Sequence, residues 1–277
     1  MRSLTLIAIS LRCYATAMDR RSFLQSLGLV GVTAGTTYWL ARPRVRRPKG
    51  VYVQMGTSIT AGIHAPGAYL TPVIVGSRLN LTPINVGFSG AGAGVYQRPA
   101  NDDFSLRELV DAITSGDWSA QDRSIASMAG GNQAQLARIK TVDFSRVTHL
   151  GLEYGTNDFT VCAPLAAFKE SLNYSVEKLL ASFPRARVFL ITPAWLLNFE
   201  ELDSDTHPNQ SGIFLKQYVD AMISVATATG VPCLDMWRTL GINATNYKAF
   251  TFDGTHPNET GARIRGEVIA SFISSAF

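Results

Sequence analysis

The sequence predicts an α/β protein, a three-layer α/β/α sandwich in which helices cover both faces of a central, parallel, five-stranded sheet. Short apolar runs alternate with longer segments of helical spacing from residue 51 onward, which is the pattern of parallel α/β folds. The runs are continuously apolar, as in strands that are buried on both faces. With 277 residues and ordinary aliphatic and aromatic content, the chain can bury one large core.

The predicted strands are 51–55, 84–86, 147–153, 188–192 and 231–235. The predicted helices between them are 69–79, 105–113, 134–139, 165–183 and 214–229, and a last helix is expected over 260–277. Open parallel sheets bind their ligands beyond the carboxyl ends of the strands. The residues that directly follow each predicted strand are therefore the candidates for chemistry.

The first 49 residues are predicted to be an export signal or N-terminal anchor with a basic linker, and residues 50–277 the folded domain. Residues 19–24 (DRRSFL) place paired arginines before an uncharged stretch over 26–41. This layout resembles the twin-arginine signal of proteins that are exported already folded. We therefore expect export machinery as a partner and a periplasmic or secreted location.

Three features of this leader stay open. Residues 32–34 (VTA) form a usable cleavage site, but the stretch over 26–41 could instead remain as a membrane anchor. It is short for a membrane span, which needs about 20 residues. Met1 and Met18 are both possible starts.

The net charge of +4 comes from this N-terminal segment. Nine of the 25 Lys and Arg residues and one of the 21 acidic residues lie within residues 1–49, which leaves 16 basic and 20 acidic residues in the rest. A mildly acidic folded part argues against nucleic acid as a partner. Cys162 and Cys233 remain outside the leader, and their pairing stays open. No Cys/His spacing indicates a metal site, and we expect no cofactor.

Residues 56–62 (GTSITAG) follow the first predicted strand and place Ser58 on a strand-to-helix turn. A hydroxyl there is exposed, and nearby N–H groups point at developing negative charge. Ser58 is therefore a candidate nucleophile, with a helix N-cap serine as the alternative interpretation. Thr60 stands where the nucleophile-elbow motif of α/β-hydrolases has its second glycine, so that motif is not matched.

Residues 85–94 (NVGFSGAGAG) follow the second predicted strand. Their four glycines let the backbone approach a ligand and turn N–H groups toward it. The spacing fits neither a dinucleotide fingerprint nor a P-loop, and a loop without a role is the alternative. After the third strand, Asn157 in residues 155–158 (GTND) offers an amide that does not titrate; an Asx turn is the alternative there.

Asp253 and His256 lie three residues apart in a turn before the last predicted helix. A carboxylate so placed can accept the imidazole Nδ1–H and fix its tautomer, which leaves Nε2 to take a proton from a serine. A helix-capping Asp beside a surface His is the alternative interpretation. His207 stands in a similar segment, but Ser204 lies where an acidic partner would be. We therefore expect His256, rather than His207, to be the base.

Three other features carry weaker predictions. The long segment over 193–211 follows the fourth strand, and its apolar residues Trp195, Leu196, Leu197 and Phe199 could line an acyl pocket or pack as core. His149 lies within a predicted strand and is expected to be structural. His64 is close enough to Ser58 in sequence to line the cleft.

The four blocks, taken together and in this order, resemble the SGNH, or GDSL-type, hydrolase family, which implies the flavodoxin-like sandwich predicted above. The residues that give the family its name would be Ser58, Gly90, Asn157 and His256. The resemblance implies that Ser58 attacks an ester carbonyl, His256 takes its proton and Asp253 orients His256. It also implies an oxyanion hole of the Ser58 and Gly90 N–H groups with the Asn157 side chain.

The resemblance covers residues 51–277 and departs from the family pattern at one position of its name motif. Thr57 stands in place of the Asp of the GDS motif; that Asp does not attack the substrate. Gly90 is expected as the oxyanion glycine, rather than Gly87, because the interval from Asn85 to Gly90 matches the family's spacing.

The resemblance implies a carboxylic-ester hydrolase, which would be an esterase, a deacetylase or a lysophospholipase-like enzyme acting on small-molecule, glycan or lipid esters. An envelope glycan O-acyltransferase with the same triad is the first alternative, because the choice between water and a sugar hydroxyl depends on the cleft. A non-catalytic carbohydrate-binding module is the second, although binding alone has no need of Ser58, Asp253 and His256 together.

Overall fold

The computed structural model describes residues 48–277, apart from residues 66, 99, 129–131 and 198–200. The predicted export signal, its cleavage site and the stretch considered as an anchor all lie outside the described residues. Of the predicted basic linker, only Pro48 and Lys49 are described.

The strands of the described chain are β1 (Val51–Gly56), β2 (Thr82–Gly87), β3 (Val147–Glu153), β4 (Arg187–Ile191) and β5 (Cys233–Leu234). They form one sheet of order β2-β1-β3-β4-β5, and every neighbouring pair is parallel. The predicted α/β fold around a five-stranded parallel sheet is therefore confirmed. The order is flavodoxin-like and reverses between β1 and β3, where folds of this kind bind their ligands.

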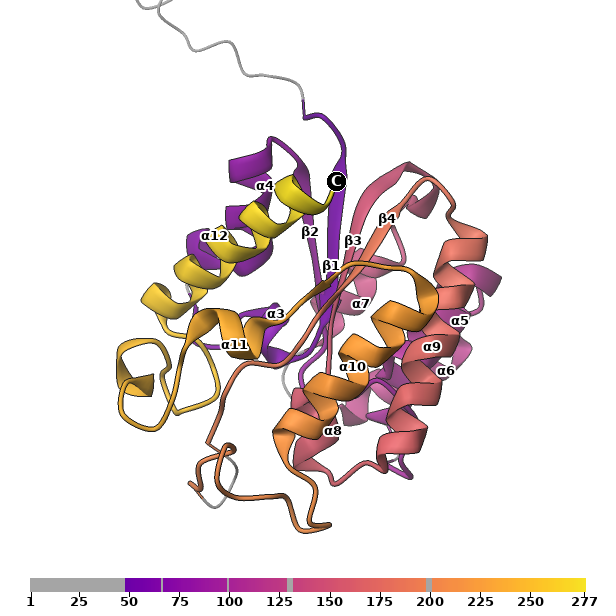
Figure 1. Cartoon of the computed structure of the whole chain (residues 1–277). Coiled ribbons are helices and arrows are strands. Elements are labelled where there is room, and N and C mark those ends of the chain that lie inside the picture. Colours follow the sequence, from indigo (N-terminus) through magenta and orange to yellow (C-terminus); the bar gives the residue numbers. More distant parts are fainter. Residues whose placement is uncertain (1–47, 66, 99, 129–131, 198–200) are drawn as a thin grey trace, which may run out of the picture. The chain divides into compact units, whose positions relative to one another are not determined.

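Helices pack on both faces of this sheet. The longer ones are α4 (Thr71–Leu79), α5 (Leu106–Ser115), α7 (Gln133–Ile139), α9 (Leu165–Ser182), α10 (Leu215–Thr229) and α12 (Glu259–Ala276). Figure 1 shows α4 and α12 on one face and α5, α9 and α10 on the other. Along β4, Phe189 and Ile191 belong to the core cluster beneath α12, whereas Val188 and Leu190 belong to the cluster on the opposite face. Burial on both faces explains why the strand runs are continuously apolar.

The structure differs from the predicted elements mainly at β5. A strand over 231–235 was expected, but β5 begins only at Cys233, after the Val231 N–H donates back to the Ala226 carbonyl of α10 at 3.1 Å. It ends at Leu234, because Asp235 caps the next helix, α11 (Met236–Leu240). The Asp235 carboxylate accepts the N–H of Arg238 at 3.0 Å. The short helices α3 (Ser58–Ala61), α6 (Ser119–Ser124), α8 (Thr156–Thr160) and α11 were not predicted, because each is too short to repeat a helical apolar period.

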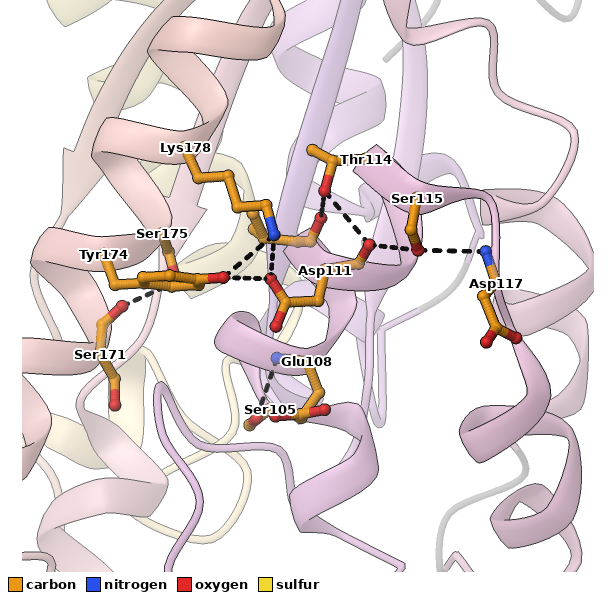
Figure 2. A network of polar contacts seen from close by, with 11 residues as sticks. Ser105, Glu108, Asp111, Thr114, Ser115, Asp117, Ser171, Tyr174, Ser175 and Lys178 are labelled. Atoms are coloured by element: carbon orange, nitrogen blue, oxygen red, sulfur yellow. Dashed lines mark hydrogen bonds and ion pairs between the residues drawn. The ribbon is translucent and has the colours of Figure 1, made fainter.

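A polar network joins α5 to α9 away from the sheet (Figure 2). The Tyr174 hydroxyl and the Lys178 ammonium both donate to Asp111 Oδ1, at 2.6 and 2.5 Å. The Ser105 side chain caps α5 by accepting the N–H of Glu108. Partly exposed ion pairs contribute little to stability, so the apolar contacts beneath the network hold these helices to the sheet.

Cys162 and Cys233 are both free thiols, so the pairing that the sequence left open does not form between them. Across the described part of the chain, no helix is both long enough and apolar enough to span a bilayer. The same described residues contain no cluster of His, Cys, Asp and Glu side chains suited to a metal ion.

Candidate active site

Ser58 is the first residue of α3, directly after the turn that ends β1. The capping role that the alternative interpretation gave to Ser58 belongs instead to Thr57, whose Oγ1 accepts the N–H of Ile59 at 3.3 Å. Thr57, which replaces the Asp of the GDS motif, is buried, and its hydrogen bond to Ile59 stabilises the turn. The Ser58 hydroxyl is left free of capping, and the residue is 9% exposed.

Ser58, His256 and Asp253 form a continuous chain of polar contacts. His256 Nε2 lies 2.9 Å from Ser58 Oγ, and His256 Nδ1 lies 2.7 Å from Asp253 Oδ2. Asp253 Oδ1 accepts the backbone N–H groups of His256 and Thr255 at 2.7 and 2.9 Å. The carboxylate thus fixes Nδ1 as the protonated ring nitrogen, and Nε2 faces the serine as an acceptor.

The electrostatics of Asp253 suit that arrangement. Burial raises the pKa of Asp253, but the hydrogen bonds from the His256 ring and from the His256 and Thr255 N–H groups outweigh it and lower the pKa below its usual value. The carboxylate therefore stays ionised through neutral and mildly acidic pH, and its charge stabilises a protonated imidazole.

The loop that carries Asp253 and His256 is supported by the long segment after β4. The N–H of Leu197 donates to the Gly254 carbonyl at 3.1 Å, and the Thr255 hydroxyl donates to the Leu197 carbonyl at 2.9 Å. Trp195 and Leu196 are 2–3% exposed, and the Trp195 indole donates to Asp203. Trp195 and Leu196 therefore pack as core beneath this loop, and Phe199 lies outside the described residues.

The glycine loop after β2 approaches Ser58 from the next strand. Gly87 packs against α3, where a Cβ would lie 2.2 Å from the N atom of Ala61. Gly90 instead has a φ of 82°, which favours glycine, and its carbonyl accepts the Asn101 amide at 3.1 Å. Within the described residues the Gly90 N–H donates to no acceptor, so it is free to bind a ligand oxygen.

Asn157 lies in the first turn of α8, beyond the end of β3. Its side-chain amide donates one hydrogen to the Ala91 carbonyl at 2.8 Å, which ties Asn157 to the glycine loop. An amide group carries a second hydrogen, so one donor remains for a substrate oxygen. The three predicted oxyanion residues, Ser58, Gly90 and Asn157, thus follow β1, β2 and β3 at one edge of the sheet.

Asp158 joins the two loops that carry Gly90 and Asn157, a role that sequence reasoning missed. Its Oδ1 accepts the Ala93 N–H at 2.7 Å and the Tyr96 hydroxyl at 2.8 Å, and its Oδ2 accepts the Gly155 N–H at 2.9 Å. Burial raises the pKa of Asp158 above its usual value, and these hydrogen bonds offset only part of that rise. The side chain is fully buried and fixes the spacing between the loops.

A second buried network lies behind Ser58. Glu153, at the end of β3, pairs with Arg265 of α12. Glu153 Oε2 accepts the Thr60 hydroxyl at 2.6 Å and the Gln54 amide at 2.7 Å. Sequence reasoning missed this network, although a polar residue inside an apolar strand or on the apolar face of a helix is a signal for a buried partner.

The other histidines lie apart from this chain of contacts or at its rim. His64 stacks on Phe252 with ring centroids 4.1 Å apart, and its ring lies 5.9 Å from that of His256; it borders the site, as expected. His207 is exposed and contacts the Thr206 hydroxyl. His149 lies in β3 at the opposite edge of the sheet from Ser58.

Comparison with known proteins gives one family and several similar folds. A model of the GDSL-like Lipase/Acylhydrolase family matches residues 55–264, a stretch that contains Ser58, Gly90, Asn157, Asp253 and His256. No curated protein matches the sequence.

Three solved structures illustrate the fold similarity. One is a carbohydrate esterase family 2 enzyme with a carbohydrate-binding domain from Corynascus thermopiles (Myceliophthora fergusii), with a TM-score of 0.58, 20% identity, and coverage of 85% of this chain and 68% of that chain. A possible lipase from Chitinophaga pinensis DSM 2588 has a TM-score of 0.55, 16% identity, and coverage of 82% and 98%. A salicylyl-acyltransferase from a tetracycline biosynthetic pathway has a TM-score of 0.53, 16% identity, and coverage of 83% and 55%. At these identities the likeness establishes the fold alone.

Proposed function

Because the chain belongs to the GDSL-like lipase/acylhydrolase family, we propose that it hydrolyses carboxylic esters through an acyl-enzyme on Ser58. The observation that carries the proposal is the 2.9 Å contact between His256 Nε2 and Ser58 Oγ, with Asp253 bound to the far side of the ring. A serine hydroxyl is a weak nucleophile unless a base takes its proton. His256 is positioned to be that base.

In the proposed acylation step, Ser58 Oγ forms a bond to the ester carbonyl carbon while its proton passes to His256 Nε2. The carbonyl oxygen becomes an oxyanion, for which the Ser58 and Gly90 N–H groups and the Asn157 amide are the proposed donors. The tetrahedral intermediate then expels the alcohol, which takes the proton from His256. Asp253 stabilises the imidazolium that exists between the two transfers.

In the proposed deacylation step, water takes the place of the alcohol. His256 accepts a proton from the water as its oxygen bonds to the acyl carbon, and the same donors bind the second oxyanion. Collapse of this intermediate breaks the bond to Ser58 Oγ, which recovers its proton from His256. The products are a carboxylic acid, an alcohol and unchanged enzyme.

Replacing Asn157 with alanine is expected to lower kcat for an ester substrate by about 10²–10³-fold, since one oxyanion donor contributes roughly that factor. The KM is expected to change much less, because the oxyanion exists only after attack. Steady-state kinetics with p-nitrophenyl acetate measure both constants. The matched control is Asn173→Ala, which removes a partly buried amide from α9 and none of the proposed donors. A fall in kcat no larger than that of the control would argue against the role of Asn157.

Hydrolysis is distinguished from glycan acylation by supplying both acceptors. Purified protein is incubated with p-nitrophenyl acetate in the presence of a neutral oligosaccharide, and the products are identified by mass spectrometry. Release of p-nitrophenol with free acetate supports the hydrolase. Acetylated oligosaccharide as the main product would instead make the chain an acyltransferase, and the absence of any turnover would count against both.

We also propose that residues 1–49 direct export of the protein across the cytoplasmic membrane, on the evidence of paired arginines ahead of an uncharged stretch. N-terminal sequencing of protein recovered from the cell envelope and the medium locates the mature start. Protein found solely in the cytosolic fraction, with an intact leader, would contradict the proposal.

A further inference from the structure

A hollow lies at the edge of the sheet opposite Ser58. It has a volume of about 420 Å³ and is lined by residues from the beginnings of β1, β3 and β4 and the ends of α4 and α12. Figure 1 shows the C-terminal end of the chain, which follows α12, beside the start of β1. Because the strands are parallel, residues at their carboxyl ends lie at the other edge. This volume falls in the range of about 300–1,000 Å³ typical of small-molecule sites.

Three cations line this hollow: Lys49, Arg185 and Arg187. No carboxylate side chain is among the described residues that line it, and none of the three cations forms an ion pair with a described carboxylate side chain. Residues 50–277 carry more acidic than basic side chains, so the charge of the hollow is opposite in sign to the net charge of the folded part. Unpaired cations around one concavity attract an anion.

Arg187 is held in place without being neutralised. Its guanidinium lies 3.4 Å from His149 Nε2 and 5.4 Å from the centre of the Phe277 ring. Because a guanidinium can only donate, His149 Nε2 is the acceptor, and the His149 Nδ1–H faces Thr148 Oγ1 at 3.0 Å. Burial and the nearby charge of Arg187 lower the pKa of His149, in agreement with a neutral ring.

Apart from Ser274, the remaining wall of the hollow is apolar. Leu79 and Leu81 line it from α4 and the start of β2, and Ile273 and Phe277 line it from the end of the chain. Phe277 is 38% exposed, so apolar surface next to the cations is open to solvent. A free inorganic anion makes no use of such a wall, whereas a hydrocarbon chain gains by covering it.

We propose that this hollow binds an anionic amphiphile, with a phosphate or carboxylate head at Lys49, Arg185 and Arg187 and a hydrocarbon chain against Leu81 and Ile273. A soluble acidic metabolite with an apolar chain and the head group of an acidic lipid share this chemistry. Binding here is independent of Ser58 and of ester hydrolysis.

The test compares three probes by isothermal titration calorimetry of the full chain at constant ionic strength: octyl phosphate, octanol and inorganic phosphate. Octyl phosphate is expected to bind at least roughly tenfold more tightly than either of the others. The double variant Arg185→Gln/Arg187→Gln is expected to weaken its binding by at least roughly tenfold, the factor that a lost charge-assisted hydrogen bond represents. Both arginines are exposed, and Arg185 makes a surface hydrogen bond to the Ser145 carbonyl at 2.9 Å, so thermal unfolding should change little.

The matched control is Arg123→Gln/Arg263→Gln, which removes the same charge from exposed positions away from the hollow. It should bind octyl phosphate as the unmodified protein does. The proposal is overturned by equal binding to both double variants, or by inorganic phosphate binding as tightly as octyl phosphate.

Vesicles identify the source of the amphiphile. Stronger cosedimentation of the control variant than of Arg185→Gln/Arg187→Gln with phosphatidylglycerol vesicles supports a lipid head group. Octyl phosphate binding without that difference supports a soluble ligand.

Discussion

Replacing Ser58 with alanine is expected to lower kcat for p-nitrophenyl acetate by at least roughly 10³-fold and to abolish labelling by a fluorophosphonate. The size of this fall in kcat follows from the mechanism. Without Oγ no acyl-enzyme forms, and only the oxyanion donors and substrate binding remain to accelerate the reaction. His256→Ala is expected to cost about as much. Adding it to Ser58→Ala should cost little more, because the two residues act as one unit. Rates and labelling are measured on the same preparations.

His207→Ala is the matched control for this prediction. His207 lies in a segment whose sequence closely resembles that around His256, but it is exposed and contacts Thr206 rather than a serine nucleophile. Its removal is expected to leave both rate and labelling near those of the unmodified protein. Undiminished labelling of Ser58→Ala, or an equal loss in His207→Ala, would refute the assignment of nucleophile and base.

The fold could be predicted from the sequence because its strands are buried on both faces. Such strands appear as short, continuously apolar runs, and the helices between them repeat their apolar residues at helical spacing. β5 was predicted too long because Val231 and Leu234 are apolar whether or not the chain remains extended. Its beginning depends on the end of α10, to which Val231 is bonded, and its end depends on the Asp235 cap of α11.

The contacts among Ser58, Asp253 and His256 could be predicted because each residue lies in a distinctive local pattern, and the topology brings those patterns to one sheet edge. The Glu153–Arg265 pair has no such pattern. Its partners are 112 residues apart, so the position of Glu153 in an apolar strand indicates a buried partner but not which residue that partner is. Only the packing of α12 against the sheet brings them together, so neither residue alone indicates the other.

The Glu153–Arg265 pair carries the second large prediction. Arg265→Met is expected to lower the free energy of unfolding by about 3–5 kcal/mol, because it leaves the Glu153 carboxylate buried without its cation. The two side chains are 4% and 3% exposed, so water cannot replace the lost partner. Urea denaturation measures the change. Arg78→Met is the control. It removes an exposed arginine of α4 that pairs with Glu267 of α12, and little change in the free energy of unfolding is expected.

The double variant Glu153→Gln/Arg265→Met separates the cost of an unpaired charge from the value of the pair. Glu153→Gln removes the negative charge but keeps an oxygen that can accept from Thr60 and Gln54. Because the double variant has no buried carboxylate without a cation, it is expected to be more stable than Arg265→Met alone. If the two substitutions instead destabilise additively, the side chains are not energetically coupled. In that case the pair does not hold α12 against α3, the helix that carries Ser58. It would then also not position the loop before α12, which carries His256.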